Sequence, residues 1–328
     1  MNNLANKTVL VTGAAGFIGS HLTERLVALG ARTRILVRYT SRGDCGWLTG
    51  TPAAAGVEVF RADLGDRRVI ANALRGADVV LHLAALIGIP YSYEAPSSYV
   101  RTNVEGTMNL LEAARDAGVS RFVHTSTSEV YGTAQSIPIG EDHPLCAQSP
   151  YAASKIAADK FAESFNRAFG LPVVTVRPFN TYGPRQSARA VVPTIVLQAL
   201  DGGPVKLGNV TPTRDMIYVD DTVDGFIRAA GADAAVGSVI NLGTGREISI
   251  RDLAAAIGRV VGRPLDLRVE EPRVRVPGSE VERLCASTSR ARSLLQWEAA
   301  TPLEEGLRRT VEWIRAHRHE YKVDGYAV

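Results

Sequence analysis

The sequence has little of what marks secreted, membrane-spanning or metal-dependent proteins. Its 328 residues include three cysteines, Cys45, Cys146 and Cys285, which are widely spaced and odd in number. This favours reduced thiols over a disulfide framework or a zinc site. The start, MNNLANKTVL, lacks the basic and apolar segments of a secretion signal, and no apolar run approaches the roughly 18 residues of a membrane span. We therefore expect a cytoplasmic protein with no membrane partner and no metal.

An excess of charge of one sign is also lacking. The formal net charge of +3 is dispersed along the chain, and no basic tract or patch of interleaved aromatic residues occurs. These features argue against a nucleic-acid partner. The apolar content of 45% and the length are those of an ordinary globular chain of one large or two unequal domains.

What the sequence does contain is a nucleotide-binding pattern near its start. KTVLVTGAAGFIGSHLTERLVALG predicts an apolar strand, a glycine-rich turn and an amphipathic helix. Glycines at these positions allow a tight turn and a close backbone approach, and the helix N-terminus offers free N–H groups to a pyrophosphate. We therefore expect a dinucleotide to bind at Gly13, Gly16, Phe17, Ile18 and Gly19.

The end of the second predicted strand, RTRILVRYTSRG, bears on the choice of dinucleotide. A ribose with a free 2′-hydroxyl is usually held by an Asp or Glu about twenty residues beyond the glycines. No acid stands there, and Val37 is instead followed by Arg38, with Ser41 and Arg42 close by. Because a guanidinium suits a 2′-phosphate, Arg38 and Arg42 favour NADP over NAD. The alternative is that Arg38 is a solvated residue at the strand end.

A candidate catalytic centre lies between residues 122 and 155. The apolar run of FVHTSTSEVYG breaks into small hydroxyls and a carboxylate, which predicts a buried strand that delivers Thr127, Ser128 and Glu129 to its open end. In SPYAASKIAADKFAESF, Tyr151 and Lys155 stand four apart on one face of a predicted helix. An ammonium favours the phenolate, so we expect Tyr151 beside Lys155 to act as a base near neutral pH.

Later segments indicate a second lobe. LPVVTVRPFNTYGPRQ predicts a buried strand that ends near Asn180, whose amide suits a sugar hydroxyl or phosphate. Strict strand–helix alternation then stops, and Arg189, Lys206 and Arg214 supply cations for a diphosphate. We expect an α/β fold with a doubly wound parallel sheet. Residues 1–180 plus about 215–250 would form the dinucleotide domain, and about 181–214 plus 251–328 a smaller C-terminal α/β substrate-binding lobe.

Taken together, these motifs resemble the extended short-chain dehydrogenase/reductase superfamily in its nucleotide-sugar epimerase/dehydratase branch. The matches are Gly-x-x-Gly-x-x-Gly, ADL, HLAA, TNVEGT, RPFNTYGP and TRDMIYVDD. The resemblance implies a Rossmann fold, a nucleoside-diphosphate-sugar substrate and a homodimer. It implies further cofactor contacts from Asp63, Leu64, Leu83, Ala84 and Ala85. It also implies substrate contacts from Asn103, Asn180, Arg189, Val191, Lys206, Arg214 and Glu280.

The carboxylate of Glu129 limits which enzyme types of this branch the sequence resembles. Simple 4-epimerases of this branch usually lack an acid at this position, whereas 4,6-dehydratases and UDP-glucuronate decarboxylases carry a Glu. Ser128 stands where the dTDP-glucose dehydratases have Asp, as in the GDP-mannose type. IPYSY, HTSTSEVYGTAQ, PFNTYGPRQSARAV and SEVERL are most similar to the N-acetylglucosamine-nucleotide 4,6-dehydratases of legionaminic-acid pathways.

The resemblance implies a 4-keto-6-deoxy product, made from UDP- or GDP-N-acetylglucosamine or a related hexose. Tyr151, assisted by Thr127, would take the proton of the 4-hydroxyl while C4 gives a hydride to the nicotinamide, and Lys155 would hold the ribose. Glu129 would then remove the C5 proton. Water would leave from C6, and the hydride would return to C6. Either Glu129 or Ser128 with water would protonate the leaving hydroxyl.

Three other functions stay open from the sequence. UDP-glucuronate decarboxylation begins with the same C4 oxidation, so Thr127, Glu129, Tyr151 and Lys155 suit it equally. Nucleotide-sugar 4-epimerisation is a further alternative. A non-catalytic dinucleotide-binding regulator is an alternative of another class. The combination of Thr127, Tyr151 and Lys155 argues against a regulator, because a sensor needs no proton relay.

Overall fold

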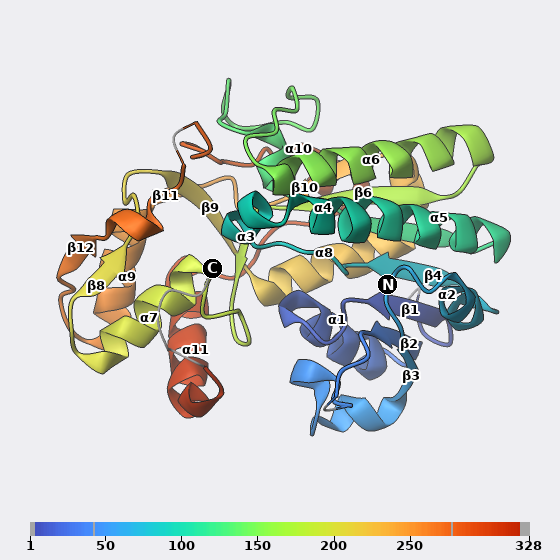
Figure 1. Cartoon of the computed structure of the whole chain (residues 1–328), viewed down its shortest axis with the longest axis horizontal. Coiled ribbons are helices and arrows are strands. Elements are labelled where there is room, and N and C mark those ends of the chain that lie inside the picture. Colours follow the sequence, from blue (N-terminus) through green and yellow to red (C-terminus); the bar gives the residue numbers. More distant parts are fainter. Residues whose placement is uncertain (1–3, 42, 277, 322–328) are drawn as a thin grey trace.

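The chain is built around a seven-stranded parallel sheet (Figure 1). A computed structural model describes residues 4–41, 43–276 and 278–321, so Arg42 lies outside the described residues. The strand order is β3-β2-β1-β4-β5-β6-β10. The strands are β1 (Thr8–Thr12), β2 (Arg32–Val37), β3 (Val57–Arg61), β4 (Val79–His82), β5 (Arg121–Thr125), β6 (Val173–Pro178) and β10 (Val239–Leu242). Central strands such as β1, TVLVT, are buried along their whole length, as expected for a sheet covered on both faces.

Helices cover both faces of this sheet. On one face, α1 (Phe17–Ala28) packs against α8 (Val219–Gly231). On the other lie α2 (Arg67–Leu74), α5 (Gly106–Asp116) and α6 (Pro150–Phe169), seen in Figure 1 beside the sheet. The strand order reverses between β1 and β4, and ligands of such sheets bind at the carboxyl ends of the strands near that point. The predicted doubly wound α/β fold is therefore confirmed.

The remaining elements form a smaller α/β part. Strands β7 (Asn180–Tyr182), β9 (Thr213–Tyr218) and β11 (Glu247–Ser249) make one sheet, and β8 (Val205–Leu207) pairs with β12 (Leu267–Val269). Helices α7 (Val191–Asp201), α9 (Ile250–Val261) and α11 (Leu303–Ala316) pack together and gather with β8 and β12 at one end of the molecule (Figure 1). Helix α10 (Ser289–Leu295) lies in the segment 251–328, which is predicted to belong to the substrate-binding lobe. It contacts α8 and β10, which are parts of the large sheet and its helical cover. The domain boundaries stay a prediction.

Two tryptophans join distant parts of the chain. The short helix η1 (Gly46–Leu48) follows β2 and places Trp47 edge-on to Trp313 of α11, with ring centroids 5.3 Å apart. The backbone N–H of Trp47 donates to the carbonyl oxygen of Ala15 in the glycine turn at 3.2 Å. The loop after β2 is thus attached both to the glycine turn and to the last long helix. Among the described residues, no helix is long and apolar enough to cross a membrane.

Candidate active site

The glycine turn after β1 is packed too closely for side chains. Gly13 has a left-handed φ of +72°, and a Cβ there would lie 2.8 Å from the backbone nitrogen of Ala84 after β4. Any side chain at Gly19 would collide with the backbone of Gly13. Helix α1 begins at Phe17 after Gly16 without a side-chain cap, which leaves its first N–H groups for a ligand. These residues fit the pyrophosphate of a dinucleotide.

The other residues predicted to bind the cofactor follow neighbouring strands of the same sheet. Arg38 is exposed directly after β2. Asp63 and buried Leu64 come shortly after β3, and the half-buried Leu83, Ala84 and Ala85 come directly after β4. Because parallel strands end at one edge, the structure places this set beside the glycine turn.

Asn103 occupies a supporting position, in contrast to the substrate contact predicted for it. It lies in the π-helical segment η3 (Val100–Glu105) and is 1% exposed. Its Oδ1 accepts from the N–H of Leu86 at 2.8 Å, and its Nδ2 donates to the carbonyl oxygen of Leu86 and to Ser154 Oγ. These partners occupy both ends of the amide, so Asn103 holds the loop after β4 against α6.

The hydroxyl-rich segment after β5 turns into the short helix η4 (Ser128–Tyr131). Thr127 caps it, because its Oγ1 accepts from the N–H of Glu129 at 3.2 Å. Ser128 and Glu129 are both buried. The Glu129 carboxylate lies 3.8 Å from Nη1 of Arg275.

Helix α6 brings Tyr151 and Lys155 to the same place. The helix is capped by Ser149 and has Pro150 in its first turn, so Tyr151 lies near its N-terminus. The Tyr151 hydroxyl is hydrogen-bonded to Thr127, and the Lys155 amine donates to the carbonyl oxygen of Thr125 at 2.6 Å. The structure therefore assembles Thr127, Glu129, Tyr151 and Lys155 around the end of β5.

The electrostatics of this group differ from the prediction. Burial raises the pKa of Tyr151 above its ordinary value, and the charge of Glu129 adds to this, against the hydrogen bond from Thr127, which lowers it. Burial also lowers the pKa of Lys155 to about 8. Desolvation thus outweighs any attraction between the two side chains. Tyr151 is protonated at neutral pH in the protein on its own, and the expected depression of its pKa by Lys155 is not seen.

The predicted substrate residues divide into two groups. Asn180 begins β7, and its buried Oδ1 has no hydrogen-bond partner among the described residues, as a ligand-binding acceptor would. Arg189 is exposed two residues before Val191, which begins α7. Lys206, by contrast, lies on β8 and pairs with Glu270 at 2.9 Å, at the far end of the molecule from α6 (Figure 1).

Arg214 and Glu280 lie close to Glu129. Arg214 is buried, donates to the carbonyl oxygen of Val281 at 2.8 Å and pairs with the Glu280 carboxylate at 3.1 Å. Arg275 links this pair to Glu129, because its Nη1 lies 3.6 Å from Glu280 and is buried without a hydrogen-bond partner among the described residues. Two arginines and two carboxylates thus alternate beside the end of β5.

Sequence reasoning missed two charged residues of this region. Arg275 stands in EPRVRVPG, where no local pattern separates it from a solvated charge. Asp159 is buried one helical turn beyond Lys155, and the regular spacing of Tyr151, Lys155 and Asp159 placed all three on one helical face. That spacing was a signal that could have identified it.

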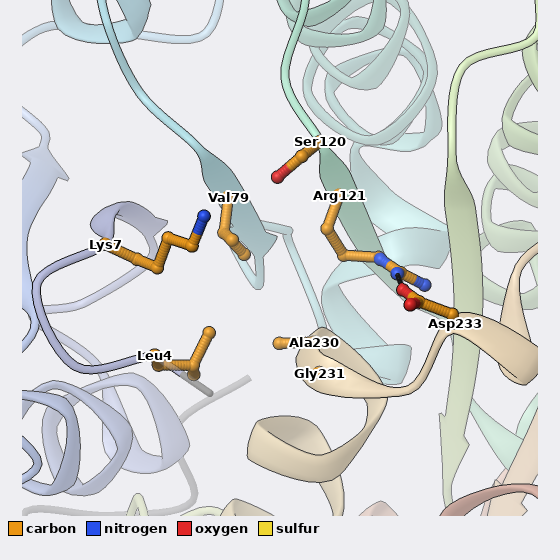
Figure 2. Close-up of a pocket in the computed structure, with 8 residues that line it drawn as sticks. All are labelled: Leu4, Lys7, Val79, Ser120, Arg121, Ala230, Gly231 and Asp233. Atoms are coloured by element: carbon orange, nitrogen blue, oxygen red, sulfur yellow. Dashed lines mark hydrogen bonds and ion pairs between the residues drawn. The ribbon is translucent and has the colours of Figure 1, made fainter. Parts of the chain in front are cut away.

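A separate cavity of about 230 Å³ opens at the opposite edge of the sheet (Figure 2). Leu4, Val79 and Arg121 line it near the amino ends of the strands, and Arg121 pairs with Asp233 at 2.6 Å. Because parallel sheets bind ligands beyond the carboxyl ends of their strands, this cavity is not the candidate active site. Within the described ranges, no three His, Cys, Asp or Glu side chains are grouped as a metal site.

Comparison with known proteins agrees with this geometry. The family model for GDP-mannose 4,6 dehydratase matches residues 10–310. UDP-glucose 4-epimerase of Mycolicibacterium smegmatis is 38% identical over 312 residues, covering 93% of this chain and 98% of that protein.

Two solved structures are similar over almost the whole chain. The dTDP-glucose 4,6-dehydratase of Streptomyces venezuelae, with NAD bound, has a TM-score of 0.89 at 32% identity and covers 96% of this chain and 99% of that one. A mutant of UDP-glucuronic acid 4-epimerase from Bacillus cereus, with NAD and UDP-4-deoxy-4-fluoro-glucuronic acid, has a TM-score of 0.88 at 30% identity, covering 94% and 99%. The resemblance seen in the sequence is confirmed: the chain belongs to the GDP-mannose 4,6-dehydratase family of NAD-dependent nucleotide-sugar 4,6-dehydratases and 4-epimerases within the extended short-chain dehydrogenases/reductases.

Proposed function

We propose that this enzyme is a nucleoside-diphosphate-sugar 4,6-dehydratase that makes a 4-keto-6-deoxy sugar nucleotide from UDP- or GDP-N-acetylglucosamine or a related hexose. The observation that carries the proposal is the buried carboxylate of Glu129, two residues after Thr127 and beside Tyr151. A 4-epimerase needs no base for the C5 proton, whereas elimination across C5 and C6 does.

Each side chain of the site has its own role in the proposed reaction. Tyr151, hydrogen-bonded to Thr127, would first give its own proton to solvent, and its phenolate then takes the proton of the 4-hydroxyl. Lys155, fixed by Thr125, keeps a positive charge near the phenolate that accepts this proton. Once C4 is a ketone, the C5 proton is acidic, and Glu129 removes it. Glu129 or Ser128 with water then protonates the departing 6-hydroxyl.

The cofactor would lie along the glycine turn and the ends of β1 to β4. Gly13, Gly19 and the uncapped start of α1 would hold its pyrophosphate, and Tyr151 and Lys155 would meet its nicotinamide ribose. When bound, the nicotinamide accepts a hydride from C4 and gives it back at C6. We propose that Arg38, exposed after β2 in place of an acid, makes NADP preferred over NAD.

One observation favours a second candidate, a reaction on a nucleoside-diphosphate uronate. Arg275 lies 3.8 Å from Glu129, and its Nη1 lacks a hydrogen-bond partner among the described residues. A guanidinium at this place suits a carboxylate at C6 of the sugar. The reaction would then be decarboxylation of UDP-glucuronate or its 4-epimerisation.

Mass spectrometry of the purified enzyme with a panel of nucleotide sugars tests both candidates. The panel contains UDP- and GDP-linked N-acetylglucosamine, glucose and mannose, dTDP-glucose and UDP-glucuronate, each with NAD or NADP. Loss of water supports the dehydratase, loss of carbon dioxide the decarboxylase, and an isomer of unchanged mass the epimerase. Tyr151→Phe is the control that separates catalysis at this site from a contaminating activity.

We also propose that the protein is a homodimer joined through α5 and α6. Phe161 and Phe169 of α6 are exposed at 36% and 54%, and a second copy of the chain packed against this helix would cover both rings.

A further inference from the structure

Asp159 is a buried carboxylate on the catalytic helix to which the proposed mechanism gives no role. It lies one turn after Lys155 on α6 and is 5% exposed. Ser126 Oγ donates to it at 2.7 Å, and His124 Nε2 lies 3.0 Å away. Arg177 of β6 donates to it through Nε at 3.2 Å and Nη2 at 2.9 Å. Four contacts on one buried carboxylate make a fixed arrangement rather than a chance pairing.

These contacts align the catalytic helix with the end of β5. Three side chains on successive turns of α6 bind three successive residues of the strand end. Tyr151 binds Thr127, Lys155 binds the carbonyl oxygen of Thr125, and Asp159 binds the hydroxyl of Ser126. A shift of the helix along the strand would break all three contacts together.

The negative charge of Asp159 also acts on the positively charged amine of Lys155. The titratable groups around this lysine are His82 from β4, His124 from β5, and Tyr151 and Asp159 from α6. Arg177 from β6 faces Asp159 and also binds the Tyr131 hydroxyl of η4 at 2.9 Å. Burial lowers the pKa of both histidines, so they are neutral at pH 7.

The charge of Asp159 is permanent over the working pH range. Burial alone would raise its pKa, but His124, Arg177 and Lys155 together lower it to about 2. Burial lowers the pKa of Lys155 to about 8, and the charge of Asp159 opposes that shift.

We propose that Asp159 is a positioning residue for C4 oxidation: its carboxylate holds the end of β5 in register with α6 and keeps the amine of Lys155 positively charged. The inference rests on the proposed roles of Tyr151 and Lys155. Asp159 is buried, and its carboxylate oxygens are bound by side chains of the protein itself. It acts through Lys155 and through Ser126, the residue before Thr127.

The test measures the titration of Lys155 directly. The chain has only five lysines, Lys7, Lys155, Lys160, Lys206 and Lys322, so lysine labelled with ¹³C at Cε gives few NMR signals, and Lys155→Arg assigns the one of interest. In the wild-type protein without cofactor, we expect this signal to titrate near pH 8. In Asp159→Asn we expect its midpoint to fall by about one pH unit, because one opposite charge is lost. Loss of activity on the alkaline side should move by the same amount, and kcat should fall about tenfold or more.

Two further variants guard against a purely structural effect. Asp159→Asn leaves the buried guanidinium of Arg177 without its carboxylate partner, which can prevent folding. The double variant Asp159→Asn/Arg177→Gln removes both charges. It replaces the single variant in the NMR titration if the single variant does not fold. Glu163→Gln removes a half-exposed carboxylate one turn further along α6 and should leave the Lys155 titration unchanged.

The outcomes separate this inference from the proposed function. A folded variant without Asp159 that keeps the wild-type Lys155 midpoint and pH profile overturns the inference. A wild-type protein that oxidises no nucleotide sugar at C4 overturns the proposed function, while the NMR titration still decides whether Asp159 controls the charge of Lys155.

Discussion

The amine of Lys155 donates to the carbonyl oxygen of Thr125 at 2.6 Å, which fixes the catalytic helix to the last residue of β5. In the same structure the phenol of Tyr151 is bound to Thr127, two residues further on. The two side chains predicted to act as a pair therefore each have their own anchor on the segment 125–127. Their relative position is set by the strand end rather than by a direct contact between them.

Tyr151→Phe should abolish the first chemical step, because the variant keeps the ring and loses the phenol oxygen whose deprotonated form accepts the substrate proton. We expect kcat to fall by about 10²- to 10⁴-fold with unchanged circular dichroism. Tyr99→Phe is the matched control, since the Tyr99 ring packs edge-on against Tyr151 at 6.2 Å. Tyr99→Phe should turn over normally. Normal turnover of Tyr151→Phe as well would show that Tyr151 is not the base.

Glu129→Gln should stop elimination while C4 oxidation still occurs, because an amide cannot take the C5 proton. We expect dehydration to fall by about 10²- to 10⁴-fold, with 4-keto sugar retained on the enzyme. With substrate deuterated at C4, the wild type should place deuterium in the 6-methyl group, which NMR detects. Exposed Glu282→Gln is the control. Full dehydration by the Glu129 variant, or a product inverted at C4 with its 6-hydroxyl intact, would contradict the proposal.

Arg38→Asp should reverse the cofactor preference. One charge-assisted contact to a 2′-phosphate contributes about 1.5–3 kcal/mol, so the ratio of the NADP and NAD dissociation constants should change about ten- to hundredfold. Isothermal titration calorimetry measures both constants. Arg32→Asp, at the other end of β2, should leave the ratio unchanged. Equal binding of both cofactors by the wild type would refute the role given to Arg38.

Stability should fall on the acid side of neutrality. Burial lowers the pKa of His82 and His124, so the unfolded chain takes up protons near pH 6.5 while the folded protein does not. The unfolded state then binds more protons, so the free energy of unfolding decreases as the pH falls below about 6.5, until each histidine is protonated in the folded protein as well. The decrease is at most about 1.4 kcal/mol per pH unit for each histidine. Urea midpoints between pH 7.5 and 5 measure this. His82→Gln should reduce the slope, and a midpoint independent of pH would show that these histidines do not control stability.

Phe161→Glu should convert the proposed dimer into monomers. A charge in an apolar contact between two copies of α6 would be desolvated without a partner. Size-exclusion chromatography with light scattering should give twice the mass of one chain for the wild type and the mass of one chain for the variant. Val274→Glu, at an exposed position outside α5 and α6, is the control. A monomeric wild type would exclude this interface.

Local patterns in the sequence were enough to predict the sheet, the glycine turn and the catalytic helix. Each apolar strand and the polar residues that follow it lie within one short segment of the sequence. The sequence alone therefore identifies the carboxyl edge of the sheet. Gly13 and Gly19 mark the turn for the same reason, since each is required by backbone packing within the β1–α1 unit and against β4.

The features that were missed depend on tertiary contacts. Asn103 binds Leu86 and Ser154, which lie 17 and 51 residues away, so no local motif shows that its amide is already occupied. The raised pKa of Tyr151 follows from burial, which its helix pattern does not show. Arg275 reaches Glu129 only because a loop of the smaller part returns to the end of β5.

The contact between Trp47 and Trp313 gives the protein an optical signal of its own. Trp297, the third tryptophan in the sequence, is buried and donates to the carbonyl oxygen of Asp221, so its surroundings are fixed. Trp47 is half-buried on the loop after β2, and Trp313 belongs to the last long helix. Any movement that separates this loop from that helix would change the environment of both indoles, so unlabelled tryptophan emission would report such a movement in real time.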